Sequence, residues 1–90
     1  MGYIYRMQPH YRTLLVIYEI VKNDPQPTTY QCRPRELILR QMTDWAIIQD
    51  HLAILKSEEL ITTKQLDTMV ISITDQGIEK ITSFTQTSVL

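Results

Sequence analysis

The chain has 90 residues, with nine Lys and Arg against ten Asp and Glu, so its formal net charge is −1. This length fits one domain with a modest core, since domains of this size bury about 60–65% of their unfolded surface. Hydrophobic residues make up 43% of the chain and charged residues 21%, which excludes disordered, collagen-like and low-complexity classes. The near-neutral charge also removes the simplest sign of nucleic-acid binding, a strongly basic domain.

Cys32 is the single cysteine, so no internal disulfide is expected and a reducing compartment is favoured. The first residues lack the basic start and long apolar run of a signal peptide. The longest apolar run, residues 14–18, is far shorter than the roughly 20 residues of a membrane helix. We therefore expect a soluble protein of the cytoplasm.

Residues 1–8 are expected to form an N-terminal arm that precedes one domain over residues 9–84. Pro9 suits the first position of a helix, because that position needs no backbone N–H. Apolar residues then recur at helical spacing over residues 10–22, which predicts an amphipathic helix with a wide apolar arc. The many β-branched side chains of residues 14–21 leave a buried strand as the alternative.

Two prolines and an Asn-Asp pair end this helix and predict a loop over residues 23–27. A short extended stretch is expected over residues 28–31, followed by a short second helix that begins near Pro34. The side chains expected to point inward from this helix are Leu37, Ile38 and Met42.

A tight turn is predicted over residues 41–43, and it leads to a third helix over residues 44–58. Thr43 is the expected N-cap, and Asp44 suits the positive end of the helix dipole. The third helix has the clearest periodicity of the chain. Its apolar stripe consists of Trp45, Ile48, Leu52 and Leu55. Its opposite face consists of Ala46, Gln49, Asp50, Ala53, Lys56 and Ser57.

Alternating patterns over residues 60–64 and 69–74 predict a β-hairpin with its turn at residues 65–68. Thr74 is expected to cap a last helix that runs to Phe84. Gly77 is expected to allow close packing at the start of this helix. Residues 85–90 are expected to form a frayed tail.

This order of elements resembles that of a winged helix-turn-helix domain. Residues 48–61 look like the segment from recognition helix to wing in MarR/PadR-like transcriptional regulators, with a His-Leu pair, a further Leu and a closing Leu-Ile. Residues 69–77 resemble the second wing strand and the Thr-x-x-Gly start of the last helix. The resemblance covers residues 9–84 and implies a mainly α fold of the α+β class, with a three-helix core, a two-stranded wing and a C-terminal helix. Glu59 departs from it, since these regulators usually have Gly there.

The resemblance implies a DNA-binding transcriptional regulator. In the helix-turn-helix mode the second helix of the motif enters the major groove, and the first helix crosses the phosphate backbone. The expected base contacts are Ala46, Gln49, Asp50 and Ala53. The expected phosphate contacts are Arg33, Arg35, Arg40 and Lys64.

A monomer with so few cations would bind double-stranded DNA weakly. We therefore expect a homodimer, because it doubles the number of phosphate contacts. Apolar surface for pairing is available in the N-terminal arm, the first helix and the last helix. The candidate interface residues are Tyr3, Tyr5, Val16, Ile20, Ile78, Ile81 and Phe84.

Two other classes of function stay open at this stage. A winged helix that contacts only protein is the alternative, and the acids that favour it by repelling DNA are Asp44, Asp50, Glu58 and Glu59. We do not expect an enzyme, a metal or a cofactor, since His10, His51 and Cys32 show no metal-ligand spacing. Only two glycines are present, so no Gly-rich phosphate loop is possible, and His51 is expected to serve packing or hydrogen bonding.

Overall fold

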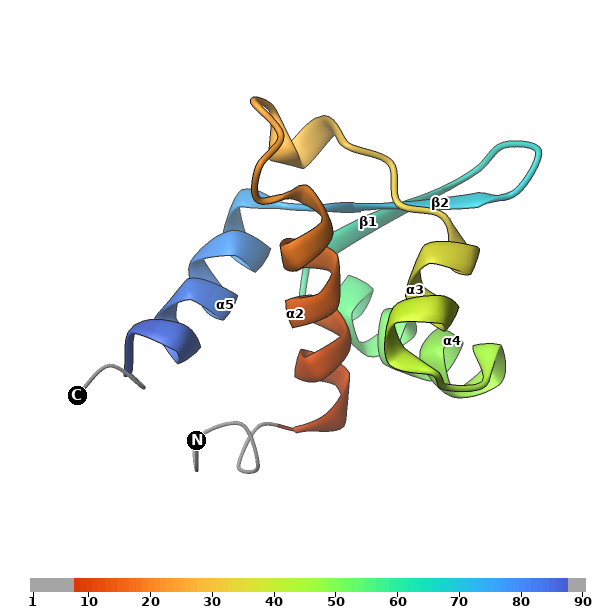
Figure 1. Cartoon of the computed structure of the whole chain (residues 1–90), viewed down its shortest axis with the longest axis horizontal. Helices are drawn as coiled ribbons and strands as arrows, with labels where there is room; N and C mark the ends of the chain where they lie inside the picture. The colour runs from red at the N-terminus through yellow and green to blue at the C-terminus, as the bar shows by residue number, and fades with distance from the viewer. Residues whose placement is uncertain (1–7, 88–90) are drawn as a thin grey trace.

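The computed structural model describes residues 8–87 of the chain, and the side chains of residues 8–84. This part contains four α-helices, one 3-10 helix and a two-stranded antiparallel hairpin, so the predicted α+β class is confirmed. The elements are α2 (Pro9–Val21), η1 (Pro27–Thr29), α3 (Pro34–Gln41), α4 (Trp45–Ser57), β1 (Ile61–Gln65), β2 (Met69–Ile73) and α5 (Asp75–Thr87). Helix α2 stands between α5 on one side and α3 with α4 on the other, and the hairpin crosses above them (Figure 1).

Helix α2 begins at Pro9, as the sequence predicts, and it excludes the alternative of a strand over residues 14–21. Its buried face consists of His10, Thr13, Leu14, Ile17 and Val21. Within the described residues, no helix is both long and apolar enough to span a bilayer.

The stretch predicted as extended, residues 28–31, is partly helical. Pro27–Thr29 forms a 3-10 turn, because the fixed φ of proline suits the start of such a turn. The backbone becomes extended at Tyr30, and Cys32 then pairs with Ile71 of β2. The Cys32 N–H donates to the Ile71 carbonyl at 2.8 Å, and the Ile71 N–H donates to the Cys32 carbonyl at 2.9 Å. This bridge fastens the segment before α3 to the hairpin.

Two predictions about the turn between α3 and α4 are wrong. Met42 does not point into the core but is 85% exposed, because it occupies the left-handed position (φ 54°) that ends α3. Thr43 is not the N-cap of α4, since its hydroxyl donates to the Gln41 carbonyl at 3.0 Å. Asp44 is the N-cap residue instead, and α4 begins at Trp45.

The predicted apolar stripe of α4 faces the core. Ile48, Leu52 and Leu55 are buried, and Trp45 is half-buried against the same cluster. Two other isoleucines on the edge of this stripe stay in contact with solvent, Ile47 at 47% exposure and Ile54 at 40%.

The hairpin pairs β1 with β2 from Ile61 opposite Ile73 to Gln65 opposite Met69. Both strands and the turn after Gln65 agree with the prediction, within one residue at each end. Helix α5 runs past Phe84 to Thr87, because neither Pro nor Gly interrupts it there. The predicted tail is therefore helical in its first part, and residues 1–7 and 88–90 lie outside the described residues.

The ends of α4, the hairpin and α5 meet at one corner. Glu59 follows α4 in the left-handed conformation (φ 63°), at the position where the regulators that the sequence resembles usually have Gly. The Thr74 hydroxyl donates to the Glu59 carbonyl at 2.8 Å and accepts from the Gly77 N–H at 3.0 Å, which confirms its capping role. A Cβ at Gly77 would overlap the Leu60 carbonyl oxygen, so the helix can approach the strand this closely only without a side chain.

Candidate functional site

All four predicted phosphate contacts, Arg33, Arg35, Arg40 and Lys64, are exposed. Within the described residues, none of them forms an ion pair that would neutralise its charge. Arg33 makes one contact that the sequence did not predict: its Nη1 donates to the Thr68 hydroxyl at 3.3 Å. This bond joins the start of α3 to the turn of the hairpin.

The arginines divide into two groups along α3. Arg33 precedes the first turn of the helix and reaches the hairpin. Arg40 lies in the last turn, where it lines a groove together with Arg12 of α2. The predicted single cluster of cations is therefore spread along the length of α3, and Arg12 joins its far end.

The four predicted base contacts, Ala46, Gln49, Asp50 and Ala53, are all exposed on α4. This face continues into a recess of about 210 Å³ between α4 and the hairpin. The residues that line the recess are Gln49, Leu52, Ala53, Lys56, Thr63 and Met69. The exposed face of α4 and the hairpin thus form one continuous surface.

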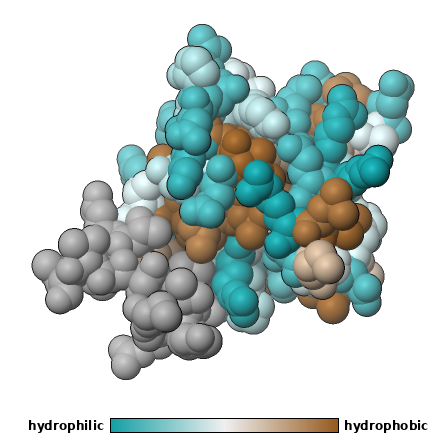
Figure 2. All heavy atoms as spheres, viewed as in Figure 1, coloured by the Kyte–Doolittle hydropathy of each residue, from teal (hydrophilic) through white to brown (hydrophobic). Residues whose placement is uncertain are grey.

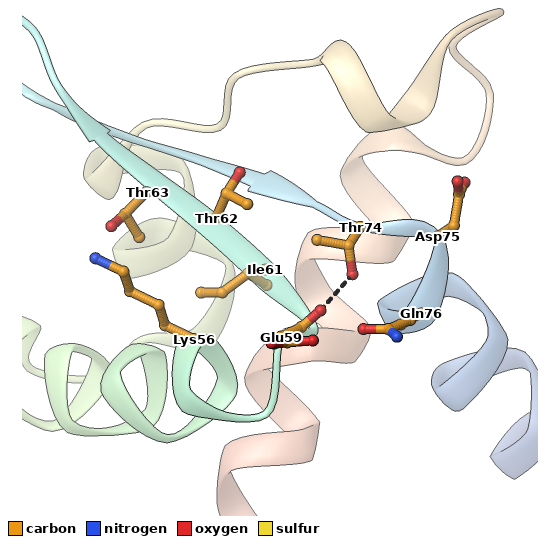
Figure 3. Close-up of a pocket in the computed structure, with 8 residues that line it drawn as sticks. All are labelled: Lys56, Glu59, Ile61, Thr62, Thr63, Thr74, Asp75 and Gln76. Carbon is orange, nitrogen blue, oxygen red and sulfur yellow. Dashed lines mark hydrogen bonds between the residues drawn. The ribbon is translucent and has the colours of Figure 1, made fainter.

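A larger hollow of about 640 Å³ lies where α4 ends, β1 begins and α5 starts (Figure 3). Lys56 extends from α4 toward Thr63 of β1, while Asp75 and Gln76 belong to the first turn of α5 (Figure 3). The hollow holds both a cation and carboxylates, and it is open to solvent. Its lining comprises Lys56, Glu59, Ile61, Thr62, Thr63, Thr74, Asp75 and Gln76.

A buried hydroxyl connects α2, α3 and α4. Thr13 of α2 is fully buried and donates to Gln41 Oε1 of α3 at 3.1 Å. Its oxygen also lies 2.8 Å from His51 Nδ1 of α4, so His51 donates from Nδ1 when the Thr13 proton goes to Gln41. His51 therefore forms a hydrogen bond, as predicted.

Burial lowers the pKa of His51 below its ordinary value of 6.5, and the nearby His10 lowers it further. The neighbouring Asp50 acts in the opposite direction with a smaller effect. At neutral pH the imidazole is therefore uncharged, which suits its single hydrogen bond to Thr13.

Glu58, at the end of α4, serves a structural role in this chain. Its Oε1 accepts a hydrogen bond from the Tyr11 hydroxyl at 2.8 Å, and its Oε2 lies 3.9 Å from His10 Nε2. Burial and the Glu58 carboxylate raise the pKa of Tyr11 above its ordinary 10.0. The contact ties the start of α2 to the end of α4.

The predicted dimer surface needs one correction. Ile81 is fully buried in the core of its own chain, because the face of α5 that carries it packs against that core, so it cannot contact a second chain. Val16, Ile20, Ile78 and Phe84 are only half-buried, and the Phe84 ring packs against Tyr11 with 5.3 Å between ring centroids. The predicted interface residues Tyr3 and Tyr5 lie outside the described residues.

The described residues include no cluster of three or more His, Cys, Asp or Glu side chains that could hold a metal ion. Cys32 is fully buried, and burial raises the pKa of its thiol to about 12.

Sequence reasoning missed the roles of Thr13 and Thr68. Only Thr13 had a local signal, since it is a polar residue at a core position of α2.

In comparisons with family models, with curated proteins and with solved structures, the chain matches none of them.

Proposed function

We propose that the chain is a winged helix-turn-helix protein that binds double-stranded DNA and regulates transcription. In this proposal α3 and α4 form the helix-turn-helix motif, and the hairpin is the wing. Helix α4 enters the major groove, and the cations of α3 and β1 contact phosphates.

The continuous surface formed by α4 and the hairpin is the observation that carries the proposal. Gln49 and Lys56 share the recess with Thr63, so the helix and the hairpin can contact the same duplex together. Gln49 can form a bidentate contact with adenine, and Asp50 can accept a hydrogen bond from cytosine. The bond from Arg33 to Thr68 supports it further, because it holds the hairpin beside the start of α3.

Charge is the main difficulty for DNA binding, since Asp44 and Asp50 are exposed on the same helix as Gln49. Arg33, Arg35 and Lys64 oppose them, and the described residues provide no carboxylate partner for any of the three. A homodimer would double these contacts and hold two α4 helices about 34 Å apart, one turn of DNA. A monomeric mass at micromolar concentration would contradict the dimer.

Fluorescence anisotropy with a random duplex at low and at moderate salt tests the proposal. We expect binding that weakens steeply with salt, since each phosphate contact contributes about 0.9 to the slope of log K against log salt. Replacing both Arg33 and Arg35 with Ala should flatten that slope by about two, whatever the sequence of the duplex. Gln49→Ala should change the preference between duplexes and leave the slope unchanged.

Lys22→Ala is a control for loss of positive charge, because Lys22 lies at the C-terminal end of α2, outside the proposed DNA surface, and pairs with Glu19 at 3.6 Å. It should bind DNA as the parent does. Absence of binding at low salt, or equal losses in the control and the Arg variants, would rule the proposal out.

The second candidate function is a module that binds another protein. Exposed apolar side chains beside the α3–α4 turn favour it: Leu39 is 61% exposed, Met42 85% and Ile47 47%. Brown side chains gather over α3 and the turn that follows it (Figure 2). DNA has little apolar surface that could cover these side chains, whereas a protein partner would bury them.

A further inference from the structure

We propose that the groove between α2, α3 and α4 binds an acidic segment of a partner protein that carries apolar anchor residues. The inference deepens the second candidate function and does not depend on DNA binding.

The groove has a volume of about 490 Å³ and combines an apolar wall with two cations. Leu15, Val16 and Ile47 supply the apolar wall, while Arg12 and Arg40 stand on α2 and α3. Among the residues that the structure describes, no carboxylate belongs to the lining. A segment that presents both carboxylates and apolar side chains complements this surface.

Both guanidinium groups are available for such a partner. Arg12 and Arg40 are exposed, and neither forms an ion pair within the part of the chain that the structure describes. Arginine binds carboxylates through two parallel hydrogen bonds, so two arginines across one groove select an acidic partner.

Gln41 adds a polar contact at the base of the groove. Its Oε1 accepts from Thr13, but its Nε2 is buried and has no hydrogen-bond partner among the described residues. A buried donor without an acceptor is unfavourable, so a partner's oxygen that reaches Gln41 would stabilise the bound state.

The apolar wall distinguishes a peptide from other anions. Leu15, Val16 and Ile47 line the groove together with the two arginines. A small anion would leave these side chains in water, and a sugar-phosphate backbone has little apolar surface to cover them. An amphipathic helix that lies along a groove buries such residues through anchors at helical spacing.

The test is a titration of the ¹⁵N-labelled chain, without DNA, with a synthetic peptide of roughly 16 residues, long enough to form a helix. The peptide combines Glu with Leu at helical i, i+3, i+4 and i+7 spacing. We expect saturable changes in the amide signals of Val16, Ile47 and their neighbours, and weaker binding by at least about tenfold when Arg12→Glu and Arg40→Glu are combined.

Three matched controls make the result specific. A peptide with Lys in place of Glu, and one with Ser in place of Leu, should bind at least about tenfold more weakly. Lys22→Glu makes the same charge change on α2 as Arg12→Glu but lies outside the groove, and it should bind the acidic peptide as the parent does. The milder pair Arg12→Gln and Arg40→Gln keeps the test decisive if the Glu variants unfold.

Four outcomes would overturn the inference. They are equal binding of the Lys peptide, binding unaffected by the Arg variants, the same signal changes with acetate alone, and the same changes on dilution of the chain without peptide. Signal changes in the groove caused by duplex DNA and not by the acidic peptide would assign this surface to DNA instead.

Discussion

Gly77 and Leu60 approach so closely that a Cβ on the glycine would overlap the Leu60 carbonyl oxygen. The same Cβ would lie 2.8 Å from Ile73 Cγ1, at the end of β2. The Leu60 carbonyl belongs to the backbone and already accepts from the Thr74 N–H at 3.0 Å, so it has little freedom to move. The start of α5 is thus fixed against the hairpin by the absence of one side chain.

We predict that Gly77→Ala destabilises the chain by about 1–3 kcal/mol, because the backbone must shift to relieve the overlap. Urea unfolding followed by circular dichroism measures the change. Gln76→Ala, on the exposed neighbouring position, should stay within about 0.5 kcal/mol of the parent. A variant at Gly77 as stable as the one at Gln76 would refute the close approach.

Glu59→Gly should stabilise the chain by about 0.5–1 kcal/mol. An L-residue at φ 63° carries a strain of about 1–2 kcal/mol, which glycine avoids at some cost in backbone entropy. Glu59→Ala keeps the strain and removes only the side chain, so its midpoint of thermal unfolding should match the parent. A gain in the Ala variant equal to that in the Gly variant would point to the charge of Glu59 rather than its backbone.

Thr13→Val keeps the shape of the side chain and removes its hydroxyl. We expect a loss of about 1–3 kcal/mol, since His51 Nδ1 and Gln41 Oε1 both lose their partner at a part-buried site. The measurement is the free energy of unfolding in urea. Thr62→Val, at an exposed position of β1, is the matched control and should change little. Equal stability of both variants would show that the Thr13 hydroxyl contributes nothing.

The stability of the chain should fall on acidification through His51. Its pKa in the folded chain lies below 6.5, so the unfolded chain takes up the proton first as the pH decreases. The contribution of His51 is therefore complete above pH 6.5 and is lost as the pH falls through the folded value.

Urea midpoints at about pH 7.5 and about pH 5.5 test this, with His51→Gln as the comparison. The variant retains His10 and Glu58, so a smaller difference between its two midpoints reports on His51 alone. The same difference in parent and variant would contradict the lowered pKa.

Cys32 should react very slowly with a disulfide reagent in the folded chain. With a pKa of about 12, about one thiol in ten thousand is ionised at pH 8, against about one in ten at the ordinary 9.0. The reagent releases a coloured thiol when it reacts, so the increase in absorbance measures the reaction rate of Cys32. Addition of guanidinium should restore an ordinary rate, and a fast reaction of the native chain would contradict the burial of this side chain.

The elements that the sequence predicted correctly depend on local signals. Pro9 begins α2, the stripe of Ile48, Leu52 and Leu55 faces the core, and Thr74 caps α5, each because of its immediate neighbours. Local patterns are the strongest information in a single sequence, since periodicity and caps act within one or two turns.

The features that were predicted wrongly or missed depend on contacts between distant parts of the chain. Arg33 and Thr68 are 35 residues apart, and no pattern in either segment shows that they meet. Met42 has an apolar side chain that indicates burial, yet the left-handed backbone of the turn leaves it in solvent. The sequence identified Arg33 and Arg40 as candidate phosphate contacts. Only the fold shows that Arg33 lies at the hairpin and Arg40 in the groove.

The bridge between Cys32 and Ile71 divides the hairpin into two mechanical parts. Near the base of the hairpin, Cys32 is bonded to β2, and the Thr74 hydroxyl is bonded to the Glu59 carbonyl just before β1. Beyond the pair of Thr63 and Ile71, Val70 is still buried and Met69 packs against the core, so the part free of the core is the turn after Gln65. Any bending of the hairpin toward a partner is therefore confined to its tip, where Arg33 holds the Thr68 hydroxyl.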